Sequence, residues 1–472
     1  MIDNRLLQLM WIAIEKGGMT FVSLVTFFIY AKVLQPEQFG YAVFALAIGQ
    51  GVAMIFAPLF EDALIHESCP SQSHYDTAFW AGIVLSILLC ILVRCLIAIA
   101  DMPAELEFLV ELSLSIILFV GLSSTYVASA RINGDFDILA KRSFLARLIG
   151  ALVGVTLALN GLGPVAVIAQ AVLIEVISFL YLFVLKPRKI GFKVDSIKLK
   201  KLTSIGWLLC LRRLSWDGTA RGIPLILGAL AGPHAVGAYG FAWRTVEMPR
   251  SAISSGLLSY ALPVFSRNKA HSQELQRLFA SMTHYTSLIC APLFVGLAVT
   301  APTFVPVLFG DKWDSAIVPI QVMSLLALIS SSRLYVPSIF TAVGKPNISL
   351  MSDIIGTASA TTFTFLFASE LGIYAAMIGL VMRSVIVFPF SVRGFKTVLG
   401  CDIRTQLSPL FRPWLATFVM AIVVQLISSQ LTGFSIEVSL IAQIVTGFTI
   451  YTLMIFLFMP DIKTSLRQLI NG

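Results

Sequence analysis

The stretch from Ile205 to Ala231, IGWLLCLRRLSWDGTARGIPLILGALA, is long enough to cross a bilayer but carries four charged residues in its first two-thirds. In a helix, Arg213, Asp217 and Arg221 follow one another at intervals of four and share one face. An arginine in hydrocarbon costs roughly 2.5–3.5 kcal/mol on insertion scales, so this face should meet a water-filled cavity or a partner helix. We therefore predict a cationic cavity that handles an anionic substrate.

The composition of the 472-residue chain is that of a polytopic membrane protein. Hydrophobic residues make up 57% and charged residues only 12%, and the mean hydropathy is +0.89. The net charge of +8 comes from basic residues in short loops between apolar runs, which favours a lipid bilayer surface over nucleic acid as the partner. The six cysteines form no CxxC or His/Cys cluster, so neither a metal site nor a cofactor is predicted.

Apolar runs of about 20 residues recur along the whole chain and predict an all-α fold of about fourteen transmembrane helices. The fifth run is the shortest. The predicted spans are 8–33, 38–60, 77–100, 104–130, 144–160, 163–185, 204–231, 235–263, 278–300, 316–340, 347–368, 372–392, 410–430 and 436–459.

The distribution of lysine and arginine predicts the orientation of these spans. Segments that an internal N-terminus would place in the cytoplasm hold 22 of these residues, whereas the opposite loops hold only Lys32 and Lys312. Arg131, Arg142 and Arg147 are assigned to cytoplasmic segments in this count. We therefore expect both termini in the cytoplasm.

A weak internal repeat relates the two halves of the sequence. Pro36 to Gly40 resembles Pro233 to Gly237, an offset of 197 residues that also takes Lys16 to Arg213. Between the halves lies the most basic loop, which we expect to act as a hinge. We interpret Lys16 as a phosphate contact, with a salt bridge to the preceding Glu15 as the alternative.

A second charged stripe lies on the predicted helix 235–263, where Arg244, Glu247 and Arg250 follow at intervals of three. Pro249 should kink this helix. Two arginines to one acid leave excess positive charge that an anion would balance. Pairing of Glu247 with either arginine, as a purely structural device, is the alternative.

Isolated charges in other spans have both functional and structural interpretations. Glu175 is a candidate proton carrier, or else a carboxyl kept neutral by burial. Asp353 is the second candidate for proton coupling, although it could form a structural network with Arg333 and Arg383. Arg94 and Glu111 should pair on adjacent antiparallel helices. No GxxxxGK[ST] motif is present, so ATP hydrolysis in this chain is not indicated.

Three stretches resemble a known family: LQPEQFGYAVFALA (34–47), AYGFAWR (238–244) with YALPVFSR (260–267), and FVPVLFGDKWDSAIVPIQ (304–321). They are similar to polysaccharide transporters of the multidrug/oligosaccharidyl-lipid/polysaccharide exporter superfamily. The aromatic-Gly-acid-Lys-Trp turn, Phe309 to Trp313, is the most specific of them.

The resemblance implies two six-helix lobes plus a terminal helix pair around a V-shaped central cavity. The implied division is 1–186 for the first lobe, 187–203 for the basic cytoplasmic linker, 204–400 for the second lobe, and 401–472 for the last pair and a short tail. Family members rely on basic cavity residues of the first and seventh helices, a role that suits Lys16, Arg213 and Arg221 here.

The implied function is that of a flippase in the bacterial inner membrane, not an enzyme. Its partner would be an undecaprenyl-diphosphate-linked oligosaccharide, moved by alternating access to the outer leaflet for exopolysaccharide or O-antigen assembly. H⁺ or Na⁺ is the candidate coupling ion, and a polymerase and a chain-length regulator are candidate protein partners. The alternatives are an exporter of small amphiphilic or drug-like substrates, a membrane polymerase or ligase, and a scaffold subunit of a synthase complex.

Overall fold

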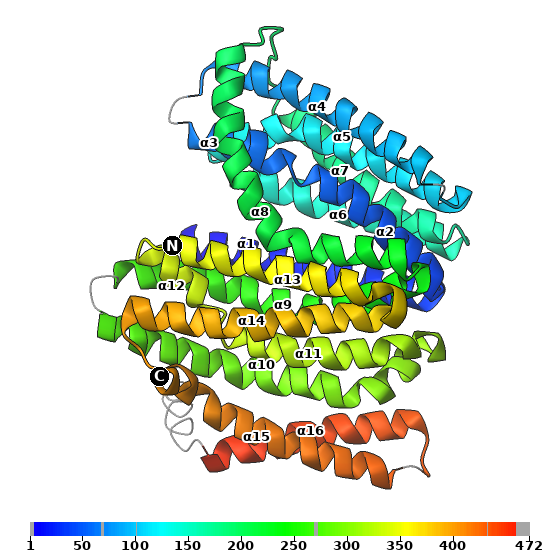
Figure 1. Cartoon of the computed structure of the whole chain (residues 1–472), viewed down its shortest axis with the longest axis vertical. Helices are drawn as coiled ribbons and strands as arrows, with labels where there is room; N and C mark the ends of the chain where they lie inside the picture. Colours follow the sequence, from blue (N-terminus) through cyan, green and yellow to red (C-terminus); the bar gives the residue numbers. More distant parts are fainter. Residues whose placement is uncertain (1–3, 68–69, 101, 269–271, 432, 459–472) are drawn as a thin grey trace. The chain divides into compact units, whose positions relative to one another are not determined.

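The computed structural model describes residues 4–67, 70–100, 102–268, 272–431 and 433–458, although the side chains of 4–17 and Trp216 are not among the described atoms. Over these residues every regular element is a helix, as predicted (Figure 1). Eleven of the helical segments are long and apolar enough to cross a membrane. Three further long helices, α1 (Asn4–Val33), α8 (Ser196–Leu230) and α9 (Pro233–Arg267), cover the other predicted spans. The count of fourteen transmembrane helices itself stays a prediction.

The chain forms two compact units, Met1–Gly240 and Phe241–Gly472. The boundary lies inside α9, and each unit has its own set of packed helices. The implied four-part division of the chain stays a prediction.

The first unit is built around α5. Besides α1 and α8, its helices are α2 (Pro36–Ala53), the short α3 (Ala63–His66), α4 (Gln72–Ile99), α5 itself (Ala104–Ile132), α6 (Phe136–Leu159) and α7 (Pro164–Leu185). α5 packs against α2, α4 and α7, and α6 lies between α7 and α1 (Figure 1). Small residues permit this close packing: a Cβ at Gly121 of α5 would lie 3.3 Å from the carbonyl oxygen of Gly82 on α4.

The second predicted span contains a break that the apolar pattern does not reveal. After α2 the chain winds into the π-helical segment η1 (Ala57–Asp62) before α3. Pro58 lies in this segment, and because a proline has no N–H, it removes one hydrogen bond of the regular α-helical ladder. The acidic pair Glu61 and Asp62 forms the last two residues of this π-helical segment.

The repeat-related turns pack against each other. A Cβ built at Gly40 would lie 1.8 Å from the carbonyl oxygen of Pro233, and one at Gly237 would lie 1.9 Å from the carbonyl oxygen of Pro36. The contact is therefore reciprocal, and only glycine fits on either side. Next to it, the His234 ring lies 2.8 Å from the Glu37 carboxylate.

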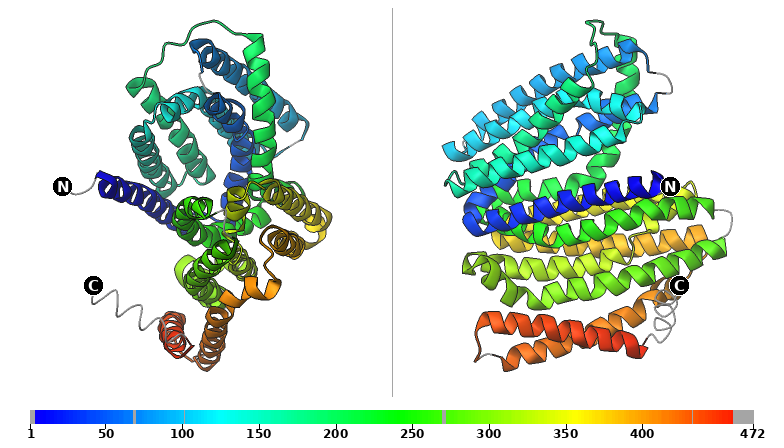
Figure 2. Two further views of the ribbon diagram at one scale, coloured as in Figure 1. Left: turned by 90° about the vertical axis from the view of Figure 1, so that its left-hand side faces the viewer. Right: turned by 180° about the vertical axis from the view of Figure 1, so that it is seen from behind.

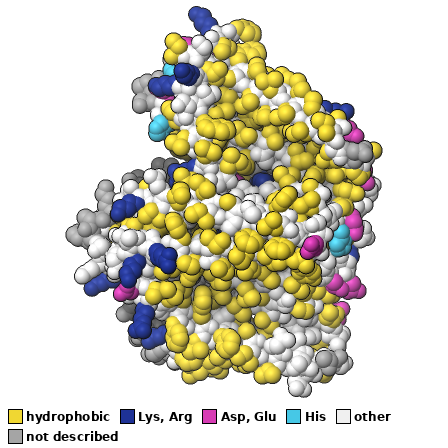
Figure 3. Space-filling model, viewed as in Figure 1, with side chains coloured by type: hydrophobic (Ala, Val, Ile, Leu, Met, Phe, Trp, Pro, Cys, Tyr) yellow, Lys and Arg dark blue, Asp and Glu magenta, His cyan; other side chains and the backbone are white. Residues whose placement is uncertain are grey.

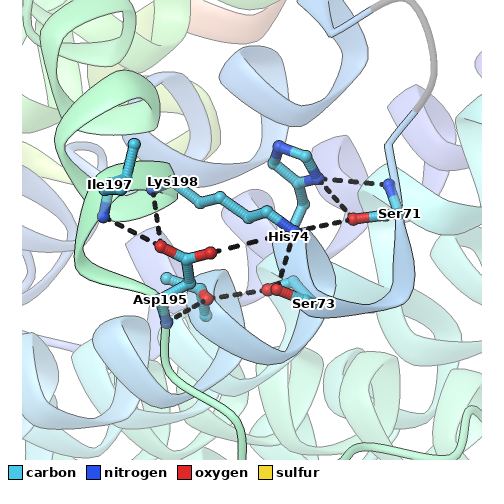
Figure 4. Close-up of polar contacts among 7 residues, drawn as sticks. Ser71, Ser73, His74, Asp195, Ile197 and Lys198 are labelled. Carbon is cyan, nitrogen blue, oxygen red and sulfur yellow. Dashed lines mark hydrogen bonds and ion pairs between the residues drawn. The ribbon is translucent and has the colours of Figure 1, made fainter.

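The basic loop between α7 and α8 is bound to α4. The Trp80 indole donates to the Gly191 carbonyl at 2.9 Å and stacks on Phe192, with ring centroids 5.2 Å apart. The Asp195 amide donates to the Thr77 hydroxyl at 3.0 Å, and Lys198 donates to Ser71 and Ser73 (Figure 4). The loop 186–195, called the strap below, is thus an ordered part of the first unit.

The strap ends in α8, whose N-terminus is capped by the Asp195 carboxylate. That carboxylate accepts hydrogen bonds from the amides of Ile197 and Lys198 (Figure 4). One turn later, Lys201 contacts Glu67 at 2.7 Å, and this hydrogen bond lowers the pKa of the Glu67 carboxyl. The ion pair thereby fixes the first turns of α8 to the end of α3.

The second unit is built around α10. It contains α10 (Ser272–Phe309), η2 (Asp311–Ala316), α11 (Ile317–Ser331), α12 (Val336–Ala342), α13 (Asn347–Leu371), α14 (Ile373–Leu399), α15 (Ile403–Gln430) and α16 (Ile436–Phe458), and it receives most of α9. α10 packs against α11, α15 and α16, and α13 and α14 form a closely packed antiparallel pair (Figure 2).

The most specific family motif has a structural role in this unit. Gly310 has φ of +86°, a conformation that favours glycine, and it directs the chain into η2. Trp313 is completely buried and stacks on Phe241, with ring centroids 4.3 Å apart. The turn therefore anchors α9 to the end of α10.

The helix surfaces match a lipid environment. Hydrophobic side chains cover most of the face shown in Figure 3, and lysine and arginine gather toward helix ends. Large exposed hydrophobic residues occur on many spans, including Leu92, Phe365 and Phe448. A soluble protein rarely exposes so much contiguous apolar surface, so a multi-pass membrane protein is indicated.

Candidate functional site

The charged residues of α8 form only part of the stripe expected from their spacing. Nε of Arg213 lies 3.5 Å from an oxygen of Asp217, one turn later, and both side chains remain partly exposed. Arg221 is half-buried and donates from Nη1 to the amide oxygen of Gln50 on α2 at 2.7 Å. Asp217 also acts electrostatically on Arg221, but it forms its ion pair with Arg213. The hydrogen-bond partner of Arg221 is therefore a neutral amide.

The π-helical segment η1 contributes a buried acid that interacts electrostatically with Arg213 of α8. Glu61 is 7% exposed, and its carboxylate lies 2.8 Å from Nη1 of Arg131 on α5. The neighbouring Asp62 lies 3.8 Å from the same nitrogen. Arg131 was expected in a cytoplasmic loop, but it lies in the last turn of α5 and neutralises a buried carboxylate.

Glu61 was missed in the sequence because the segment 61–76 showed only acids and no obvious partner. The available signal was Pro58, which lies inside an apolar run and comes shortly before the two acids. α8 packs along η1, and a Cβ at Gly206 would lie 2.6 Å from the Cα of Leu59. This packing places Arg213 within electrostatic range of Glu61.

A third group of charges lies between α6 and α7. Glu175 on α7 interacts electrostatically with Arg142 and Arg147 on α6, so it has two partners that its sequence surroundings did not indicate. Arg147 also donates to the Ser23 hydroxyl on α1 at 2.7 Å. The helix α6 begins at Phe136 and not at residue 144, so Arg142 as well as Arg147 projects from a helix, while the cytoplasmic assignment of this segment stays a prediction.

These groups are connected through Glu61, which interacts with Arg131, Arg142 and Arg213 from three different helices. The connected set of described residues contains five guanidinium groups and four carboxylates, a surplus of one positive charge. Its members are Arg131, Arg142, Arg147, Arg213, Arg221, Glu61, Asp62, Glu175 and Asp217. The side chain of Lys16, the sixth candidate cation, lies outside the described residues.

The α9 stripe belongs to the second unit. Arg250 forms a bidentate ion pair with Glu247, with Nε···Oε2 of 2.6 Å and Nη2···Oε1 of 2.7 Å. This bears out the structural interpretation of that pair, since each charge neutralises the other. Arg244 is half-buried on the same helix. A contact of these three residues with substrate stays a prediction.

The remaining predicted charges are placed as follows. Arg94 pairs with Glu111, as expected, and also with Glu107 at 2.7 Å. Asp353 and Arg383 lie on the paired helices α13 and α14. Arg333 takes no part in a network with them, because its contacts are with Ser391 and Gln406.

Comparisons with known proteins agree with this architecture. Residues 29–318 match the family described as polysaccharide biosynthesis protein. The succinoglycan biosynthesis transport protein ExoT of Rhizobium meliloti is 24% identical over 88% of this chain and 85% of its own length. The teichuronic acid biosynthesis protein TuaB of Bacillus subtilis is 21% identical over 90% of this chain and 89% of its own.

The fold is also found among solved structures. The lipid II flippase MurJ in an inward closed conformation superposes with a TM-score of 0.72 at 14% identity. The superposition covers 95% of this chain and 98% of that one. At this level of identity the match shows a common fold.

Proposed function

We propose that this chain, which belongs to the polysaccharide biosynthesis protein family, is a flippase for an undecaprenyl-diphosphate-linked oligosaccharide. It would carry the repeat unit from the inner to the outer leaflet of the bacterial cytoplasmic membrane, for exopolysaccharide or O-antigen assembly. The name of the ExoT relative, a transport protein of polysaccharide biosynthesis, supports transport rather than polymerisation. The MurJ-like fold is that of a flippase for another lipid-linked saccharide.

The observation that carries the proposal is the state of Arg221. Its guanidinium group is half-buried, and its 2.7 Å hydrogen bond goes to the neutral amide of Gln50, while Asp217 pairs with Arg213. A cation in this position, within a set of charges that is positive by one, is best stabilised by an anion from outside the protein. A diphosphate supplies two negatively charged groups whose oxygens fit the planar guanidinium group.

The acids of the first unit argue against the alternative of a drug exporter. A pocket for cationic drugs needs carboxylates that are not already neutralised. Here Glu61 is paired with Arg131, Asp217 with Arg213, and Glu175 interacts with two arginines. The charges of the described first unit therefore favour an anionic substrate.

Energy coupling would come from an ion gradient. We place H⁺ first and Na⁺ second, with Glu175 and Asp353 as the carboxylates that would exchange the ion. Both lie within predicted spans, where an ionisable residue is a functional candidate. Both termini would lie in the cytoplasm, and alternating access would expose the basic residues to each leaflet in turn. The polymerase and the chain-length regulator of the pathway would then act on the translocated repeat unit.

Variants of α8 test the proposal directly. R221Q should reduce surface display of the glycan by about tenfold or more, because a charge-assisted hydrogen bond to phosphate contributes roughly 1.5–3 kcal/mol. R213Q should have a smaller effect, because Asp217 already neutralises that arginine. The measurements are surface glycan by immunoblotting and the lipid-linked intermediate that accumulates in the inner leaflet.

The matched control is R212Q. Arg212 is adjacent to Arg213 but exposed, and it has no ion pair among the described residues. R212Q should display glycan at the wild-type level with equal protein in the membrane. Normal display by R221Q, with no accumulated intermediate, would refute the assignment of Arg221 to the substrate.

A further inference from the structure

A second cationic site lies in the other unit, at Arg333. This residue occupies the break between α11, which ends at Ser331, and α12, which begins at Val336. The break follows from the sequence, since the hydroxyls of Ser330, Ser331 and Ser332 bond back to carbonyls three residues earlier. Arg333 therefore projects from irregular backbone and not from the regular flank of a span.

Two neutral side chains hold the guanidinium group in place. Ser391 on α14 accepts from Nε at 3.2 Å and from Nη2 at 3.1 Å, and Gln406 on α15 accepts from Nη1 at 2.7 Å. Gln406 is 1% exposed, and its own amide nitrogen donates to the Cys401 carbonyl at 2.8 Å. Because that bond fixes the amide, its oxygen has to point at Arg333.

The charge of Arg333 is not balanced within the described part of the chain. None of the described carboxylates lies within ion-pair distance of it, and the thiol of Cys401 is the titratable group whose field reaches it. The nearby carboxylate of Asp402 forms its ion pair with Lys396, at 2.7 Å. A half-buried guanidinium group with only neutral partners needs an external anion.

The hydrogen bonds leave the right donors for such an anion. A guanidinium group has five N–H donors, and three of them are used by Ser391 and Gln406. One N–H remains on each terminal nitrogen, and these two can bind two oxygens of a single phosphate group. The rings of Phe395 and Phe388 flank the group at 5.4 and 6.0 Å, and they limit access of water.

We propose that Arg333, held by Ser391 and Gln406, is an anion site of the second unit that binds a phosphate group. In the predicted topology it lies toward the cytoplasmic end of its span, where Arg404 and Arg412 on α15 add positive charge. The phosphate could belong to an anionic phospholipid headgroup or to a soluble phosphate compound. The site is built from other residues than those of α8, and it does not depend on the proposed function.

The test uses the full-length protein purified in mild detergent. Phosphatidylglycerol and, in a separate arm, inorganic pyrophosphate are titrated, and binding is followed by native mass spectrometry and by the shift in thermal unfolding temperature. A lipid headgroup predicts binding in the first arm only, and a soluble ligand predicts binding in the second. Wild-type protein that binds neither probe would overturn the proposal.

Two variants separate anion binding from a purely structural role. R333Q should weaken binding by about tenfold or more. S391D places a carboxylate against Nε and Nη2 of Arg333 and leaves the hydrogen bonds of the Gln406 amide in place, so it should preserve the fold and abolish anion binding even if R333Q proves unstable. The control R393Q removes an exposed charge of α14 and should bind within about twofold of wild type. Wild-type binding by S391D would show that Arg333 is only a structural clamp.

Discussion

At the scale of single residues, the charged side chains inside the first unit depend on one another. Glu175 illustrates this, because it interacts electrostatically with both Arg142 and Arg147 on the neighbouring helix. Such an acid can act in two ways. It can hold the arginines together, or it can exchange a proton as they move.

The variant E175Q distinguishes these roles. It should lower stability by on the order of 2 kcal/mol, since a buried arginine pair loses its acid, and it should remove the dependence of transport on the pH gradient. Thermal unfolding and glycan export at two external pH values are the measurements. If E175Q exports with an unchanged pH profile, and R147Q restores its stability, the role of Glu175 is structural only.

The sequence could not reveal these partners, for a physical reason. Arg131 and Glu61 are 70 positions apart, and Arg142 and Glu175 are on different helices, so only the tertiary packing of η1, α5, α6 and α7 brings them together. Pairs within one helix were accessible from spacing alone. Arg213 with Asp217 and Arg250 with Glu247 are both separated by about one turn, and both form.

At the scale of elements, the apolar runs placed the helices well but not their ends. The span predicted as 163–185 matches α7 almost to the residue, because Gly163 and Pro164 mark its start. In contrast, α8 and α10 continue for two or more turns beyond their apolar runs and α9 for about one, since helical hydrogen bonding does not stop at the membrane surface. The start of α6 was misplaced for the same reason.

The reciprocal contact of Gly40 and Gly237 gives a sharp prediction at this scale. G40A should destabilise the protein by about 1–3 kcal/mol, because a methyl group would overlap the backbone at Pro233 and force the helix starts of α2 and α9 apart. G256A is the control, since nothing lies within 4 Å of a Cβ at that position of α9. It should be neutral or slightly stabilising. Equal unfolding temperatures for the two variants would contradict this packing.

At the scale of the whole molecule, the number of basic residues on each side determines the expected orientation. The structure places Arg131, Arg142 and Arg147 within helices, and the asymmetry remains large when they are left out of the count. The basic strap between α7 and α8, which is bound to α4, lies among the residues assigned to the cytoplasm. The orientation therefore rests on many independent residues.

Reporter fusions check the orientation. A fluorescent protein that matures only in the cytoplasm should be bright when fused after Gly472, and dark when inserted after Gly433, in the predicted outer loop. Alkaline phosphatase at the same two positions should give the opposite result. Phosphatase activity at Gly472 would reverse the assignment of both termini.

The paired glycines also bear on how such a chain diverges. Each of the two related turns occupies the space that a side chain at the other turn's glycine would need. A substitution of either glycine would therefore clash with the backbone of the other turn. Sequence changes are then tolerated mainly at positions outside this contact. If the two halves arose by duplication, the contact between the starts of α2 and α9 would stay fixed. Either half could still acquire a charged residue at another position.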